Sequence, residues 1–267
     1  MTVGVVTRFA KHAEEFPLAY YEVKGVNGVW HRPVGSAIPM ISVFGDHRVA
    51  QAHPEWVQVG PHGKKATADR EYFDWDHLCP SHEAVFELGL KWIHQAYEES
   101  QCPVIRLDDV AFAREGYCQC AACREAEQAS GLDALEYRQR RLEDFVRQAA
   151  EIGPRLELTL YPDPYPLHLE QRFGLSPDRL AVYVDRFVVP IYDQHYATTY
   201  WLEILASAFR DRLPRPFLIE LYGLQVPEEA LLRAAQVAHA YADGVLIAYD
   251  NQVEKLRRIQ HHLTNGR

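Results

Sequence analysis

The sequence of 267 residues has no stretch typical of a membrane span or a secretion signal. It contains no run of about 18 or more apolar residues, the length that a transmembrane helix requires. The N-terminal stretch 1–16 reaches a charge at Arg8, and the apolar run before it is too short for a signal peptide. We therefore expect a cytoplasmic protein that has no membrane partner.

Positive charge is also scarce. The chain has 28 Lys and Arg against 37 Asp and Glu, which gives a formal net charge of -9. Nucleic acids and anionic membranes bind to basic faces, so this balance argues against both as partners. Aromatic residues, in contrast, make up 12% of the chain, and such side chains can stack on the faces of sugar rings.

Several well-known catalytic and nucleotide-binding motifs are missing as well. No G-x-G-x-x-G or G-x-x-x-x-G-K follows an expected strand, so the commonest nucleotide-binding uses of an open α/β sheet lose support. No G-x-S-x-G occurs, and a Ser-His-Asp esterase therefore finds no support.

Apolar segments that fit buried strands alternate with helical patterns along most of the chain, which is typical of a parallel sheet covered by helices. We expect strands at 3–9, 26–31, 39–44, 104–109, 156–161, 187–192, 217–222 and 244–249. Helices are expected at 11–21, after an N-cap at Ser81, and at 133–152, 198–212, 227–241 and 252–263. Eight strands without a linker predict one domain, 1–267, folded as a (β/α)8 TIM barrel. The loop-rich stretch 25–39 predicts a compressed or incomplete N-terminal quarter.

The connection from Gly45 to Pro80 is long for a compact domain, and such loops are often functional. It is rich in histidine and tryptophan, which favours an ordered lid over disorder. Within it, His53, Glu55 and Trp56 form an H-P-E-W motif. We expect this motif to bind a sugar through its indole and polar groups, or else to pin the lid to the barrel.

Four of the five cysteines have spacings typical of a metal site. Cys118, Cys120 and Cys123 form a C-x-C-x-x-C cluster, and Cys79 lies upstream at the end of the long connection. Four thiolates close a tetrahedral shell around Zn²⁺ and leave no position for a catalytic water. We therefore predict one structural zinc held by these four residues, with Cys102 as an ordinary buried thiol.

Polar residues follow most of the expected strands, at the end where TIM barrels carry their active sites. They are carboxylates and tyrosines: Asp46, Asp108, Asp109, Tyr161, Asp163, Tyr192, Asp193, Glu220, Tyr222, Tyr249 and Asp250. Glycoside hydrolysis uses two carboxyl groups, one as an acid and one as a nucleophile or base. We expect Tyr161, Asp163, Tyr192, Asp193 and Tyr222 to bind substrate. The simpler interpretation is that loops begin there and loops are polar.

Glu220 is the strongest catalytic candidate. It lies within P-F-L-I-E-L-Y-G, where a buried carboxylate is costly unless it has partners. Alternation along the fourth strand places Arg106 and Asp108 on one face, which favours Asp108 over Asp109 as the residue that points into the barrel.

The region 40–125 resembles known glycosidases. A Cys-Pro before a helix, then a strand that ends in carboxylates, then C-x-C-x-x-C, resembles the zinc-bearing region of glycoside hydrolase family 42 β-galactosidases. H-P-E-W followed by C-P-S-H-E-A-V-F-E is similar to uncharacterised glycosidase-like TIM barrels related to that family. The resemblance implies a nucleophile on the seventh strand, at Glu220, and an acid/base at Asp109, although the family's Asn-Glu pair is Asp-Asp here. Arg106-x-Asp108 is also similar to the fourth strand of α-amylase-like barrels, in which Asp108 would be the nucleophile and Asp193 or Glu220 the acid.

These observations favour a glycoside hydrolase that acts on a small oligosaccharide or glycoside, with Asp108 or Asp109 as acid/base, Glu220 as nucleophile and retention of configuration. A catalytically silent sugar-binding barrel is the alternative, and a metal-dependent hydrolase built on the loop histidines is a third hypothesis. A homo-oligomer is compatible with the sequence.

Overall fold

A computed structural model of the chain describes residues 2–265 and contains a closed barrel of eight parallel strands. Each strand pairs with the next, and the eighth pairs with the first, which confirms the predicted TIM barrel. The strands are β1 (Thr2–Thr7), β2 (Ala19–Lys24), β3 (Ile38–Ser42), β4 (Val104–Asp108), β5 (Arg155–Thr159), β6 (Arg186–Pro190), β7 (Phe217–Tyr222) and β8 (Gly244–Ala248).

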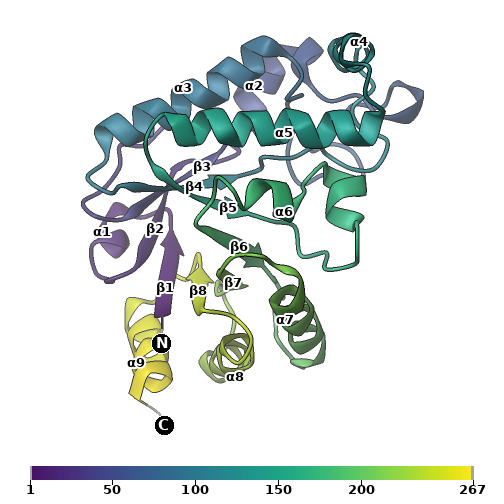
Figure 1. Cartoon of the computed structure of the whole chain (residues 1–267). Helices are drawn as coiled ribbons and strands as arrows, with labels where there is room; N and C mark the ends of the chain where they lie inside the picture. The colour runs from purple at the N-terminus through teal and green to yellow at the C-terminus, as the bar shows by residue number, and fades with distance from the viewer. Residues whose placement is uncertain (1, 266–267) are drawn as a thin grey trace.

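Helices surround the barrel, with α3 and α5 side by side along one flank and α7, α8 and α9 along the opposite one (Figure 1). The α-helices are α1 (Ala10–Ala13), α2 (His47–Ala52), α3 (Glu83–Glu99), α4 (Ala121–Ser130), α5 (Ala134–Glu151), α6 (Pro177–Leu180), α7 (Tyr200–Arg212), α8 (Glu228–His239) and α9 (Val253–Asn265). Shorter helical turns are η1 (Pro54–Trp56), η2 (Pro61–Gly63) and η3 (Leu169–Phe173). Within residues 2–265, no helix is both long enough and apolar enough to cross a membrane.

The N-terminal quarter differs from the prediction. The second strand is Ala19–Lys24, which overlaps the end of the stretch 11–21 expected to be helical, and the expected strand at 26–31 does not form. All six residues of β2 are buried, and its tyrosines and valine favour an extended chain. No strand is missing, so the barrel is complete. The N-terminal quarter is compressed in another way: β3 follows β2 with no helix between them in the described chain.

Two further local predictions were wrong. Ser81 does not cap α3, because His82 occupies the N-cap position and the Ser81 hydroxyl bonds Tyr137 instead. The cysteine loop contains a helix, α4, whose N-cap is Cys120. We did not predict this helix, because its sequence has too few apolar residues to indicate a buried face.

Side chains alternate between two layers. Outward-facing strand residues pack against the helices, and inward-facing ones such as Met40, Val188 and Leu246 form a separate cluster inside the barrel. The interior also holds charged groups. Near the N-terminal ends of the strands, Tyr20 donates a hydrogen bond of 2.6 Å to Glu157, which also pairs with Arg186 at 3.2 Å. Partners of this kind offset much of the cost of burying a carboxylate.

The long connection between β3 and α3 is folded. It contains α2, η1 and η2, and short bridges join its segments. Gln58 lies fully buried within it, donates to the carbonyls of Leu78 and Ala111, and accepts from the amide of Ala113. One amide side chain therefore fastens this connection to the loop that follows β4.

We predict that Phe145→Ala lowers the free energy of unfolding by about 3–5 kcal/mol, because it empties a fully buried site on α5. The Phe145 ring packs against Phe44 and Phe86, at centroid distances of 4.9 and 5.1 Å. Leu135→Ala, at an exposed position of the same helix, should change stability by less than about 0.5 kcal/mol. Urea unfolding measures both, and equal losses would contradict this account of the core.

Candidate active site

A cavity of about 260 Å³ opens at the C-terminal ends of the strands. Its lining includes both aspartates at the end of β4, together with Glu220 of β7 and Tyr192 after β6. The barrel therefore brings together the three residues predicted to be catalytic. It also adds Lys24 and Arg106, two cations among the lining residues.

Arg106 is the centre of this site. Its side chain is 2% exposed, and its Nε donates to Asp108 Oδ1 at 3.0 Å and to Thr159 Oγ1 at 2.9 Å. Its Nη1 donates to Glu220 Oε2. Burial alone would lower the pKa of this guanidinium, but Asp108 and Glu220 outweigh it and raise the pKa well above its ordinary value. One buried cation thus binds carboxylates from two strands.

Both oxygens of Glu220 are held. Arg106 binds Oε2, and the Tyr192 hydroxyl donates to Oε1. Burial and the Glu220 charge raise the pKa of Tyr192 well above its ordinary value, so this phenol remains a donor. The carboxylate, which is 1% exposed, is fixed in position beside the cavity.

Asp109 has a different environment. Its Oδ2 accepts from the Ser42 hydroxyl, and it has no contact with Arg106 comparable to that of Asp108. Burial and then the neighbouring charge of Asp108 raise its pKa to about 7, although Ser42 and Lys24 act in the opposite direction. Asp109 is therefore a carboxyl group that can hold a proton near neutral pH.

The backbone at Asp109 explains why both aspartates reach one cavity. Strand alternation predicts that neighbouring residues point to opposite faces, but β4 ends at Asp108 and Asp109 adopts a φ of 58°. This left-handed conformation turns the chain, so the alternation stops there. Asp108 and Asp109 both line the cavity.

A fourth carboxylate of this cavity was not predicted, because the sequence indicated a helix at 11–21 and a strand at 26–31 and so missed β2. Glu22 lines the cavity, pairs with Arg8 Nε at 3.0 Å, and accepts from the Tyr249 hydroxyl at 3.3 Å. Lys24, two residues on, lies 3.0 Å from Asp46 and donates to the Ser42 carbonyl. The alternation of Tyr20, Glu22 and Lys24 with Ala19, Tyr21 and Val23 is a strand pattern that could have identified them.

The other predicted substrate-binding residues lie in three places. The Tyr222 ring packs near those of Tyr192 and Tyr249, at centroid distances of 5.5 and 6.4 Å. Tyr161 and Asp163 line a second cavity of about 290 Å³. Asp193 is exposed and accepts from the His195 amide within its own turn, so the structure does not bring it to either cavity.

The H-P-E-W motif does not reach the active-site cavity either. His53 stacks on Trp56 at 3.8 Å and lies 3.2 Å from Glu55, and none of the three lines the cavity at the barrel mouth. The Trp56 carbonyl accepts from the amide of Cys79, and its ring packs against the core. The motif therefore packs within the long connection, outside the cavity at the barrel mouth.

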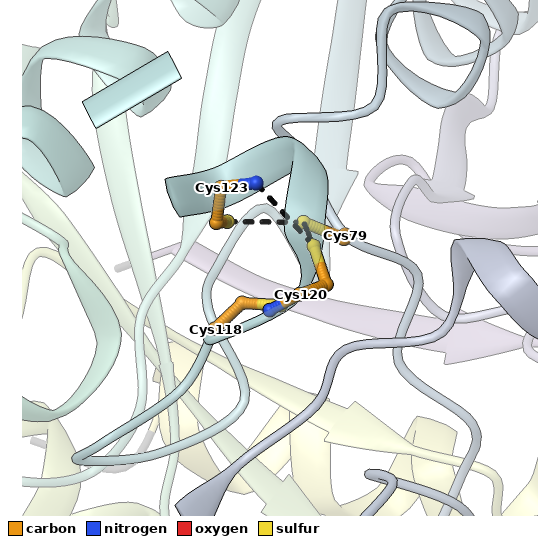
Figure 2. Close-up of side chains that lie close together, drawn as sticks. All are labelled: Cys79, Cys118, Cys120 and Cys123. Carbon is orange, nitrogen blue, oxygen red and sulfur yellow. Dashed lines mark hydrogen bonds between the residues drawn. The ribbon is translucent and has the colours of Figure 1, made fainter. Parts of the chain in front are cut away.

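The four predicted metal ligands converge. Their Sγ atoms lie within 4.8 Å of one another, and Figure 2 shows Cys79 reaching from the long connection toward the three cysteines after β4. Cys79 Sγ is 3.3 Å from that of Cys123 and 3.6 Å from that of Cys120. Tetrahedral coordination at about 2.3 Å sets sulfur atoms about 3.8 Å apart, so the cluster can hold a metal ion.

Backbone amides also point at these sulfurs. The Val59 amide donates to Cys118 Sγ at 3.2 Å, and the Cys123 amide donates to Cys120 Sγ at 3.4 Å. Such donors stabilise thiolates, the form that binds metal. Cys102 lies apart, in the cluster inside the barrel, as predicted.

The histidines of the long connection do not converge. His47 pairs with Asp76 at 2.9 Å, His53 stacks on Trp56, and His77 is buried. Burial lowers the pKa of His77 to about 3. Among residues 2–265, the cysteine cluster is the one group of three or more potential ligands that could surround an ion, so the third hypothesis finds no support.

Three solved structures with a similar fold are a glycoside hydrolase domain, a fucosidase and a β-galactosidase. The glycoside hydrolase domain of PgaB (BpsB) from Bordetella bronchiseptica has a TM-score of 0.68 at 13% identity, over 92% of this chain and 87% of that one. α-L-Fucosidase isoenzyme 2 from Paenibacillus thiaminolyticus has a TM-score of 0.70 at 13% identity, over 98% and 49%. A β-galactosidase from Bacillus circulans sp. alkalophilus has a TM-score of 0.61 at 12% identity, over 93% and 50%.

The chain shares its barrel fold with glycoside hydrolases. It spans about half the length of the fucosidase and galactosidase chains. No protein-family model matches the sequence, and no curated protein matches it. The comparisons therefore show a shared barrel fold and do not show membership of family 42.

We predict that Asp109→Asn becomes more stabilising as pH rises. A carboxyl group whose pKa is raised in the folded state stabilises the protein below its unfolded pKa of about 4 and loses that contribution as pH passes its folded value of about 7. The variant does not titrate, so its stability relative to the wild type should increase by up to roughly 4 kcal/mol between pH 4 and pH 8.

Urea unfolding at both pH values measures this difference. Asp193→Asn, at an exposed aspartate, is the matched control and should show no such trend. A constant difference between Asp109→Asn and wild type would contradict the raised pKa.

Proposed function

We propose that the protein is a glycoside hydrolase whose catalytic pair is Asp109 and Glu220. The observation that carries the proposal is the contrast between two carboxyl groups of one cavity. Glu220 is bound by a cation and a phenol, whereas burial and the charge of Asp108 raise the pKa of Asp109 to about 7. Pairs of carboxyl groups in opposed environments are typical of glycosidases.

In the first step, Asp109 donates its proton to the glycosidic oxygen, and the bond between that oxygen and the anomeric carbon breaks. A Glu220 oxygen forms a bond to the same carbon, which gives a glycosyl ester and releases the alcohol. Asp109, now ionised, then takes a proton from water as the water oxygen attacks the anomeric carbon. Glu220 leaves as a carboxylate, and the configuration is retained.

Asp108 acts as a positioning residue in this proposal. It is bound to Arg106 and Thr159, and its charge is the second cause of the raised pKa of Asp109. In this proposal Asp108 stays bound to the Arg106 guanidinium, and Asp109 holds the proton that is transferred. This assigns the acid to Asp109 rather than Asp108.

The cavity of about 260 Å³ is at the small end of ligand pockets, which suits a single sugar ring at the cleaved position. Glu22 and Tyr249 can bind its hydroxyl groups. The substrate class is therefore a small glycoside or oligosaccharide, and the pH-dependent proton donor favours turnover at or below neutral pH.

For the cysteine cluster we propose a structural zinc held by Cys79, Cys118, Cys120 and Cys123. Four protein thiolates leave no open position, so the ion would fasten loops and take no part in catalysis. Reduced thiols are kept in reducing compartments, and we infer a cytoplasmic location on this ground.

We predict that Glu220→Gln and Asp109→Asn each lower kcat/KM on chromogenic glycosides by about 100-fold or more, since each removes a group that acts in the transition state. Asp193→Asn should leave activity unchanged. The wild-type kcat/KM should fall as pH rises through about 7, as Asp109 loses its proton.

Turnover that survives undiminished in Glu220→Gln would rule out the nucleophile. A wild type that binds sugars but cleaves none of a broad panel of glycosides would favour the silent sugar-binding barrel.

We predict one zinc per chain in protein purified without chelators, as measured by elemental analysis. Cys120→Ser should abolish zinc binding and lower the melting temperature, because the ion joins two loops. Cys102→Ser, at a buried thiol outside the cluster, should leave the zinc content unchanged. Zinc well below one per chain, with four freely titrating thiols in the native protein, would contradict the site.

A further inference from the structure

The second cavity, of about 290 Å³, lies beside the active-site cavity at the mouth of the barrel. Trp75 lines both cavities and so forms a wall between them. The remaining lining of the second cavity comes from the long connection and from the loops after β4 and β5, including Phe73, Arg114, Tyr161 and Asp163. It is thus aromatic on some sides and charged on others.

Two hydrogen-bonding groups here have no protein partner. The Tyr161 hydroxyl and the Trp75 indole nitrogen are both buried, and neither has a hydrogen-bond partner among residues 2–265. Buried polar groups in folded proteins are nearly always bonded, so two unbonded groups in the wall of one cavity indicate a ligand that bonds them.

The Asp163 carboxylate is a third polar group of this cavity, and its position is fixed by neighbouring side chains. Asp163 is bound by Arg172 and lies 3.2 Å from His168, which fixes its carboxylate at the edge of the cavity. The Tyr161 ring is itself fixed by stacking on Phe173 at 3.9 Å. The cavity therefore offers two aromatic residues with unbonded polar groups, one of them fixed by stacking, and one fixed acceptor, a combination that suits a polyhydroxylated ring.

Asp109 lies close to Trp75, the residue that lines both cavities. A Cβ on Gly45 would meet both Asp109 Oδ2 and Trp75 Cδ1 at 2.9 Å, so these two groups approach the same point of the backbone. After burial, the charges of Asp109 and Asp108 raise the pKa of Tyr161, in line with a phenol close to the acid. The proton donor of a glycosidase lies where the cleaved sugar meets the leaving group.

We propose that the second cavity binds the leaving group and that this group is a second sugar, so the substrate is a disaccharide or longer. Trp75 and Tyr161 donate hydrogen bonds to its hydroxyls, and Asp163 accepts one. The identification of the bound sugar as the leaving group rests on the proposed function. Binding of a second sugar in this cavity can be tested separately from catalysis.

The test is equilibrium binding by titration calorimetry with the Glu220→Gln protein, which blocks turnover and leaves the second cavity unchanged. The probes are galactose, glucose, fucose and N-acetylglucosamine, each also as α- and β-linked disaccharides that carry it at the non-reducing end. At least one disaccharide should bind about tenfold or more tightly than its component sugars. Tyr161→Phe and Trp75→Phe should each reduce that preference roughly three- to tenfold, the effect of one lost hydrogen bond.

Two controls separate ligand binding from structure. Tyr161→Phe removes a hydroxyl that bonds no protein group, so its melting temperature should not fall, whereas a structural role would lower it. Tyr165→Phe and Trp201→Phe, at exposed positions, should change neither binding nor stability.

Disaccharides that bind no better than monosaccharides, or a preference that persists in both variants, would overturn the inference, as would binding of none of the probes. A disaccharide preference that the variants abolish, in a wild type that cleaves nothing, would support the second cavity and refute the glycosidase.

Discussion

The site depends on one buried charge. Arg106 lies inside the barrel with 2% of its side chain exposed, and such a cation is stable only if anions surround it. Asp108 and Glu220 provide them, from β4 and β7, which lie well apart around the barrel. Removing any one of the three would leave a buried charge without its partner, at a cost of about 3–5 kcal/mol. The same ion-pair network positions Glu220 and Asp108, and Asp108 is, after burial, the second cause of the raised pKa of Asp109.

The loops above the barrel preserve this arrangement. The segment after β4 begins at Asp109 and ends in the C-x-C-x-x-C cluster, so a metal bound there would anchor its far end to Cys79. Gln58 anchors its middle through the groups of Ala111 and Ala113. Both anchors come from the long connection, which also carries Trp75 to the wall between the cavities. The connection is therefore a folded part of the walls of both cavities.

Much of this could be predicted from the sequence, for physical reasons that also explain the failures. Continuous apolar runs identified β3 to β8 because both faces of a parallel strand are buried. Glu220 was identifiable because a carboxylate inside such a run needs partners. The cysteines were identifiable because metal geometry restricts ligand spacing.

The failures concern features set by the tertiary structure. Charged residues in β2 hid a strand whose interior face is polar, so Glu22 and Lys24 were missed. The alternation of side chains along β4 ends at Asp109, which has a left-handed backbone conformation, and the sequence did not show this. The H-P-E-W motif looked like a sugar site, but its indole stabilises the loop from outside the cavity. Sequence reasoning could identify these residue types but not the cavity that each one faces.

The most direct test of this account is a carbon-13 NMR titration of the aspartate carboxyl groups between pH 3 and pH 9, with Asp109→Asn used for assignment. The account predicts one aspartate signal with a midpoint near 7 that disappears in the variant. Aspartate signals that all titrate below about pH 5 would contradict it, because Asp109 could then not hold the proton that the proposed chemistry requires.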